Sequence, residues 1–248
     1  MAIITQDVKV VAGGFDLSCY FRSIDLAQEM NLLDSTALCT TGSRSFVTGI
    51  SERTISGEGY FDQNSTTDAL SIDKTFADAF SSTANKLFTV GVDGSALGDI
   101  AYLMNTKQAS YSVQETVGEI IMNMFEAKAT LDGSTHGWAA NGVFLMSQAV
   151  TGTVNVASYD DGVGATTGYF AHCHVTADDF TNMVVKIQHS TDNSAWSDLI
   201  TFTAFSGIGA QQAVNTATSI NRYIRAAVTT FTGTSATVVV AIKTGYTG

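Results

Sequence analysis

The stretch from Arg53 to Phe61 reads Arg-Thr-Ile-Ser-Gly-Glu-Gly-Tyr-Phe, and it indicates the fold more clearly than any other short segment of the chain. Every second residue is apolar or small, at Ile55, Gly57, Gly59 and Phe61. Alternation with a period of two is typical of a β-strand, because successive side chains point to opposite faces. We therefore expect a strand here, with one face toward a core.

Segments on either side have the same character. Phe21–Met30 interleaves apolar with charged residues, and both Gly118–Thr130 and Trp138–Val150 are long and apolar enough to form strands. Between the last two lies Asp132-Gly133, a favoured turn pair, so we predict that these two strands form a hairpin. The chain contains no proline, and its turns therefore depend on Gly, Asn and Asp.

Two segments interrupt the β pattern. Ala69–Ala84 places apolar side chains at helical spacing after the capping-type residues Thr66-Thr67-Asp68, which predicts one amphipathic helix packed against the sheet. Asn31–Arg53 is long, polar and glycine-containing, and we expect a loop between two strands. A loop of this length inside a compact domain usually has a function, and its apolar residues indicate that it buries something, such as a neighbouring subunit.

Composition limits the function classes. The chain has 248 residues, of which 45% are hydrophobic, with a net charge of −11 and only 12 basic residues. An acidic chain without a basic patch is not expected to grip nucleic acid. No stretch approaches the roughly 20 apolar residues of a membrane span, and Met1–Val11 lacks the pattern of a secretory signal. Three widely spaced cysteines do not form a disulfide framework.

The charge distribution suggests two domains. Residues 1–150 hold 8 basic and 17 acidic side chains, whereas residues 151–248 hold 4 and 6. We place a boundary near residues 150–158, which gives domains 1–152 and 153–248. The second domain is predicted to be a β-sandwich, because short strands recur in it at even spacing. These strands are Gly168–Val175, Met183–His189, Leu199–Phe205, Arg222–Thr230 and Ala236–Lys243.

No motif supports an enzyme or predicts a cofactor. One constellation is of interest, because His172 and His174 share a face of a predicted strand and could present two imidazoles to Zn²⁺. No third ligand has a persuasive spacing. The alternative that we favour buries Tyr169, Ala171, Cys173 and Val175 and leaves both histidines on the polar side.

Five short segments of the first half follow a recognisable order: Ile24-Asp25-Leu26, Leu33-Asp34-Ser35-Thr36, Gly42-Ser43-Arg44, Gly49-Ile50 and Ile55–Phe61. In these segments the chain resembles the tail tube proteins, or major tail proteins, of long-tailed (siphovirus-like) bacteriophages. In that family a strand leads into a Leu-Asp-x-Thr loop, a glycine-marked turn and a second strand with small alternating residues. Segments Val185–Ser190, Trp196–Leu199 and Arg222–Ala226 resemble an accessory β-sandwich of phage structural proteins.

The resemblance implies a mainly β protein: an N-terminal tail-tube-like β-barrel or sandwich with one helix, followed by a C-terminal β-sandwich. It implies a virion protein, made in the host bacterial cytoplasm, that assembles with itself into stacked rings. Other partners would be the tape measure, terminator and tip proteins, with double-stranded DNA passing unbound and no membrane. The implied inter-ring contact residues are Leu32, Leu33, Asp34, Thr36, Arg44, Phe46 and Ile50.

Three alternatives stay open at the level of sequence. The ring could be a hexamer or a trimer with pseudo-hexameric symmetry. The chain could instead be a capsid decoration protein or another virion structural protein. It could also be a carbohydrate-binding β-sandwich that uses Trp196, Tyr223 and Tyr169 as aromatic platforms.

Overall fold

The computed structural model describes residues 7–36, 44–61, 76, 85–130 and 137–247. These residues are mostly extended, which confirms the expectation of a mainly β protein. No helix among them is long and apolar enough to cross a membrane. The strands are β1 (Lys9–Ala12), β2 (Phe15–Asp16), β3 (Phe21–Asp34), β4 (Phe46–Tyr60), β5 (Lys86–Gly91), β6 (Ile100–Gln114), β7 (Met122–Ala129), β8 (Trp138–Val150), β9 (Val154–Asn155), β10 (Tyr159–Ser190), β11 (Ser197–Thr201) and β12 (Gly209–Thr244).

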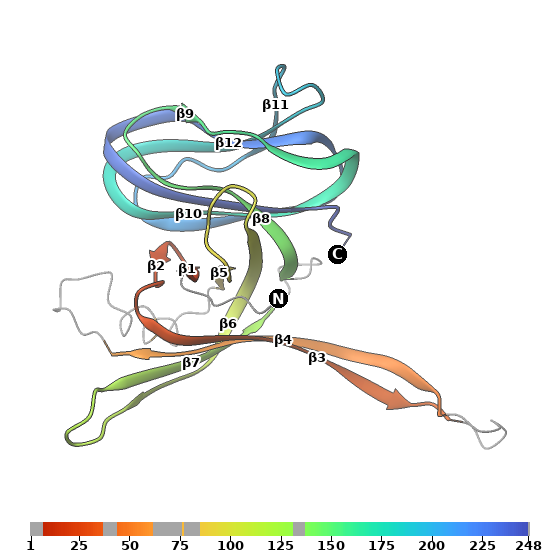
Figure 1. The fold of residues 1–248 in the computed structure, drawn as a ribbon, viewed down its shortest axis with the longest axis vertical. Coiled ribbons are helices and arrows are strands. Elements are labelled where there is room, and N and C mark those ends of the chain that lie inside the picture. Colours follow the sequence, from red (N-terminus) through yellow and green to blue (C-terminus); the bar gives the residue numbers. More distant parts are fainter. Residues whose placement is uncertain (1–6, 37–43, 62–75, 77–84, 131–136, 248) are drawn as a thin grey trace.

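The strands belong to one continuous antiparallel sheet that bends into two parts (Figure 1). We call β8 to β12 the upper body, and we call β3, β4, β7 and residues 106–114 of β6 the lower sheet. Strand β6 joins them, because Ile100–Met104 pairs with β8 and Thr106–Gln114 pairs with β7. Since pairing is continuous through β6 and β8, the predicted domain boundary near residue 152 is not a break in the sheet and stays a prediction.

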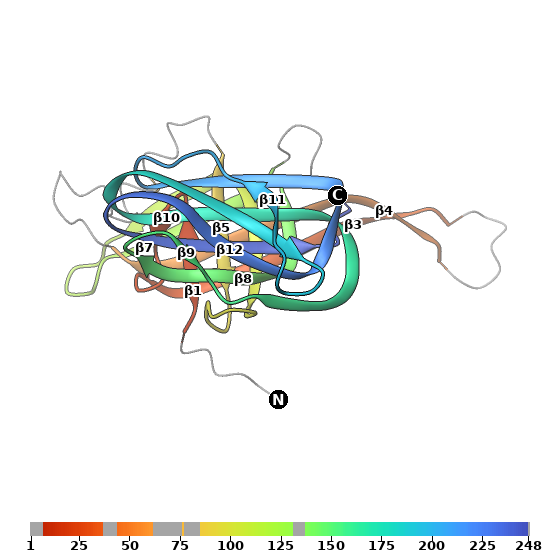
Figure 2. The same ribbon diagram turned by 90° about the horizontal axis from the view of Figure 1, so that it is seen from above.

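In the lower sheet the strands follow the order β3-β4-β7-β6. The pairing is staggered: β7 covers only Thr54–Tyr60 of β4, and the rest of the β3/β4 hairpin extends alone. We call Met30–Asp34 with Phe46–Ser51 the β3/β4 arm. It projects beyond the outline of the upper body in Figure 2. The end of the β6/β7 hairpin, residues 112–124, extends in the opposite direction (Figure 1).

Gly57 and Gly59 explain how the segment Arg53–Phe61 packs against its neighbours. Both face the core side of β4 together with Ile55, which is fully buried. A Cβ at Gly57 would lie 2.6 Å from the ring of Phe125, and one at Gly59 would lie 2.4 Å from the carbonyl oxygen of Tyr20. Their alternation therefore leaves room for an aromatic ring and for the chain that enters β3.

The upper body is built from β10 and β12, which are much longer than the strands that we predicted. Residues 169–175 of β10 pair with 209–215 of β12 on one side and with 238–244 on the other. The predicted strands at 168–175 and 183–189 are both parts of β10, and those at 222–230 and 236–243 are both parts of β12. The intervening polar residues continue the pairing through β-bulges instead of ending the strands.

Hydrophobic clusters fill both parts. The upper body holds a large one, to which Met183, Ile187 and Ile224 contribute fully buried side chains. The lower cluster is rich in aromatic rings, and Phe125 stacks on Phe76 at a centroid distance of 4.4 Å. Phe76 is the one described residue of the predicted helix at 69–84. It is helical and buried, and the remainder of that prediction lies outside the described residues.

Two predictions about connections are wrong. Strands β7 and β8 do not pair with each other in the described part of the chain, because β6 lies between their ends. The amide of Asn105 in β6 donates to the carbonyl of Gly137, and its carbonyl accepts from Thr130. Asn31–Arg53 is not a loop throughout, since pairing of β3 with β4 continues out to Asp34 and Phe46.

Candidate assembly surface

The β3/β4 arm carries most of the residues that we predicted to mediate self-association. Leu33 pairs with Val47, and Asp34 pairs with Phe46. Neighbouring Leu32 and Leu33 point to opposite faces of the arm, and both are more than half exposed. Ile50 is 85% exposed. Because both faces expose apolar side chains, the arm is not folded back onto the body of its own chain.

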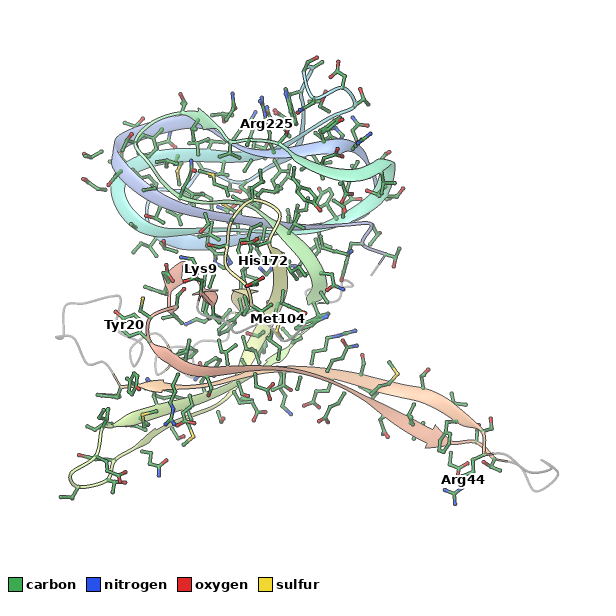
Figure 3. The ribbon with its side chains drawn as sticks, viewed as in Figure 1. Lys9, Tyr20, Arg44, Met104, His172 and Arg225 are labelled. Carbon is green, nitrogen blue, oxygen red and sulfur yellow. The ribbon has the colours of Figure 1, made fainter. Side chains whose placement is uncertain are left out.

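The end of the arm is closed by hydrogen bonds around Asp34. The Asp34 carboxylate accepts bonds from the Thr36 amide at 2.9 Å and from the Thr36 hydroxyl at 2.5 Å. These bonds lower the pKa of Asp34. The Thr36 hydroxyl in turn accepts from the amide of Ser45 at 3.0 Å. Asp34 and Thr36 therefore shape the turn, while Arg44 is exposed beside it (Figure 3).

A second exposed apolar group lies at the end of the β6/β7 hairpin, and the sequence analysis missed it. Val117 is fully exposed, Ile120 is 68% exposed, and Val113 and Met124 are also exposed. The available signal was a pair of apolar residues, Val117 just before the strand predicted at Gly118–Thr130 and Ile120 near its start. The lower sheet thus carries exposed apolar residues at both of its extremities.

The lower sheet has two unpaired edges. Among the described residues, β3 pairs only with β4. On the opposite side, β5 pairs with β6 only as far as Thr106, so residues 107–114 pair with β7 alone. Unpaired edges of this length expose amide and carbonyl groups that readily pair with another strand. The four strands alternate in direction, so β6 and the β3 of a second copy could also pair antiparallel.

The two faces of the lower sheet differ in chemistry. One packs on the core through residues such as Ile55, Phe125 and Ala127. On the other face, register and alternation place acidic residues in excess. Lys128 forms ion pairs there with Glu52 and with Glu126, and Glu52 raises its pKa. The charged side chains of this face are Asp25, Glu29, Glu52, Glu58, Glu126, Lys107 and Lys128.

The two histidines are not on a polar surface, as we had expected, but are completely buried. Figure 3 labels His172. Strand β10 is covered on both faces, and the Thr89 hydroxyl of β5 lies 3.1 Å from His172 Nδ1 and 2.9 Å from His174 Nε2. Burial lowers the pKa of His172 to about 3 and that of His174 well below its usual value. No group of three or more metal-ligating side chains occurs within the described ranges.

Trp196, one of the three predicted aromatic platforms, is partly covered. The ring of Trp196 is half-buried, and the guanidinium carbon of Arg225 lies 4.2 Å from its centre. Arg225 also donates to the side-chain oxygen of Gln188 at 2.9 and 3.0 Å. One face of Trp196 is therefore already occupied by a cation held in place from β10.

No family model matches this chain, and neither does any curated protein. Among solved structures, a chain of the virion of a native gene transfer agent particle is 16% identical with a TM-score of 0.42, covering 56% of this chain and 100% of its own. A chain of an empty gene transfer agent tail has 14% identity, a TM-score of 0.44, and coverages of 56% and 98%. The SPP1 Dit protein, from a phage hub adsorption apparatus, has 12% identity, a TM-score of 0.34, and coverages of 96% and 100%. At these scores the likeness carries no argument about what this chain builds or binds.

Proposed function

We propose that this chain is a non-enzymatic structural protein of a phage tail whose copies pair edge to edge into rings that stack as a tube. The observation that carries the proposal is the lower sheet, a four-stranded antiparallel sheet with two unpaired edges and exposed apolar residues at both extremities. A single copy leaves these features uncovered. A ring of copies covers the edges, and a stack of rings covers the apolar residues.

Edge pairing of β6 with β3 of the next copy is a head-to-tail contact, which closes into a ring when the rotation per subunit divides the circle. Six copies would contribute roughly 24 strands. At about 4.8 Å per strand and without tilt, such a barrel measures about 37 Å across at the backbone. Side chains narrow this bore and still leave space for duplex DNA.

The charge of the exposed face supports a role as a conduit. If the core face points outward toward the upper body, then the face with Asp25, Glu58 and Glu126 lines the bore. Carboxylates repel the phosphates of DNA, so a passing duplex is not held by its backbone. The upper body then lies on the outside of the tube.

In this proposal the β3/β4 arms make the contacts between stacked rings. Leu32, Leu33, Phe46 and Ile50 would pack against the adjacent ring, where burial of each apolar side chain contributes about 1.5–3 kcal/mol. Asp34 and Thr36 hold the turn that presents them. Arg44 is available for an acidic surface on the neighbour.

The proposal is tested by negative-stain electron microscopy of the purified full-length chain over a range of concentrations. We expect hollow rings or tubes of uniform width. The double variant Leu33→Asp/Phe46→Asp should stay folded by circular dichroism but form no tubes, because it places charges in the apolar contact. Val163→Asp is the matched control, since Val163 is also about half exposed but lies on the upper body. Intact tubes from the double variant would refute the assignment of the arm.

A further inference from the structure

Arg53 is a charged residue on the core face of strand β4. It shares the core face of β4 with Ile55 and Ser51, and it points toward the upper body instead of toward solvent. Its guanidinium carbon lies 5.8 Å from the centre of the Trp138 ring. The Nε atom is buried and has no hydrogen-bond partner among the described residues. Arg53 as a whole is half-buried, but a buried N–H donor without a protein partner still needs water, an ion or a ligand to accept its hydrogen bond.

A second cation faces the same space. Arg53 and Lys243 both line a pocket of about 300 Å³ between the lower sheet and the end of β12, together with Ser51, Trp138, Tyr246 and Thr247. No Asp or Glu belongs to its described lining, and neither cation forms an ion pair with a described residue. Burial raises the pKa of Tyr246, and the charge of Arg53 opposes that rise. The two positive charges therefore act on the same open pocket.

This arrangement is unusual for the chain as a whole. The chain has 12 basic residues against 23 acidic ones, and Lys9, Lys128, Lys186 and Arg222 are all paired with carboxylates. Arg53 and Lys243 line one pocket, and neither forms an ion pair with a described carboxylate. In so acidic a protein this arrangement requires an explanation. A guanidinium, an ammonium and hydroxyl donors around one cavity form the donor set that recognises oxyanions.

We propose that this pocket binds an oxyanion, a carboxylate or a phosphate group, held by Arg53 and Lys243 with Trp138 as its apolar wall. Apart from Ser51, at the base of the β3/β4 arm, the lining lies outside the arm and the unpaired edges, and the site does not depend on the proposed assembly. Its lining comes from β4, β8 and the end of β12. A bound anion therefore bridges the lower sheet and the upper body.

The two tryptophans of the chain allow a direct test with an internal control. Inorganic phosphate is titrated into the unassembled full-length protein at constant ionic strength, and the two indole N–H signals are followed by NMR. The Trp138 signal should shift and saturate, while the Trp196 signal, on β11's side of the upper body, should not. Sodium acetate is titrated in the same way. Saturation by both anions assigns the pocket to carboxylates as well, and saturation by phosphate alone assigns it to phosphate groups.

Variants make the test specific. Lys243→Gln should weaken binding about tenfold or more, since a hydrogen bond to a charged group is typically worth 1.5–3 kcal/mol. Lys107→Gln removes an exposed cation from the opposite face of the lower sheet and should leave binding unchanged. Arg53→Gln should behave like Lys243→Gln if it folds. Absence of a saturable Trp138 shift with either anion, or equal affinity in Lys243→Gln and the unaltered protein, would overturn the proposal.

Discussion

The upper body and the lower sheet use the same kind of strand in different ways. In the upper body, β10 and β12 curl around a shared cluster, and residues such as Ile187 and Ile224 are fully buried. In the lower sheet, the β3/β4 arm exposes apolar residues such as Ile50 on strands that extend past any core. The upper body therefore obtains its stability within one chain. The β3/β4 arm and the unpaired edges lie outside any core of the single chain, and in the proposed assembly another copy would cover them.

The largest expected effect comes from a matched pair of isoleucine substitutions, one in each region. Ile187→Ala should lower the free energy of unfolding by about 2–5 kcal/mol, because it leaves a cavity in the upper cluster. Ile50→Ala should change it by less than about 0.5 kcal/mol in the unassembled chain. Urea denaturation followed by circular dichroism measures both. A loss of more than 1 kcal/mol in Ile50→Ala would mean that the arm packs on its own chain.

The free energy of unfolding should fall in acid, because two buried histidines of β10 contact β5 below the upper body. The Thr89 hydroxyl of β5 links to His172 and His174 of β10, and burial lowers the pKa of His172 to about 3. A depressed histidine pKa means that the unfolded chain binds protons more readily. Stability is therefore complete above about pH 6.5 and is lost as pH falls toward the folded pKa.

By pH 5 the loss from His172 amounts to about 2 kcal/mol, and His174 adds to it in the same direction. Urea denaturation at pH 7.0, 6.0 and 5.0 measures this slope. His172→Gln serves as the comparison, because it removes one titrating group and should flatten the slope between pH 6.5 and 5. An unchanged slope in that variant would show that other groups control acid sensitivity.

Some differences between the upper body and the lower sheet could be predicted from the sequence, and others could not. The alternation at Arg53–Phe61 predicts a β-strand because side-chain period depends only on local geometry. Leu32, Leu33, Phe46 and Ile50 were predicted to contact a neighbouring subunit. The structure shows that they are exposed, and the contact itself stays a prediction. That they lie on paired strands was missed, since polar residues and Gly49 inside the segment favoured a loop.

Pairing and burial were harder to predict than strand character. A turn pair at Asp132-Gly133 favoured a hairpin between neighbours, but β7 pairs with β4, more than sixty residues earlier in the chain. Local signals do not encode such distant pairing. The histidines were misplaced for a related reason, because alternation alone does not show that β5 covers the second face of β10. Arg53 in the proposed anion pocket carried no distinguishing signal in its own segment.

The smallest expected effect concerns how the upper body fixes its surface segments. Arg225 covers Trp196 at 4.2 Å and donates to Gln188, so it holds the segment before β11 against β10 and β12. Arg225→Ala should lower the free energy of unfolding by about 1 kcal/mol, since a partly exposed cation–π contact is worth about 0.5–1 kcal/mol and the hydrogen bonds contribute a similar amount.

The same substitution should also free the Trp196 ring, which acrylamide quenching of tryptophan fluorescence would detect as increased accessibility. Arg44→Ala, beside the turn that closes the arm, is the control, because Arg44 is exposed and contacts neither tryptophan. Unaltered quenching in Arg225→Ala would mean that the apolar contacts of Trp196 hold its ring without help from the guanidinium of Arg225.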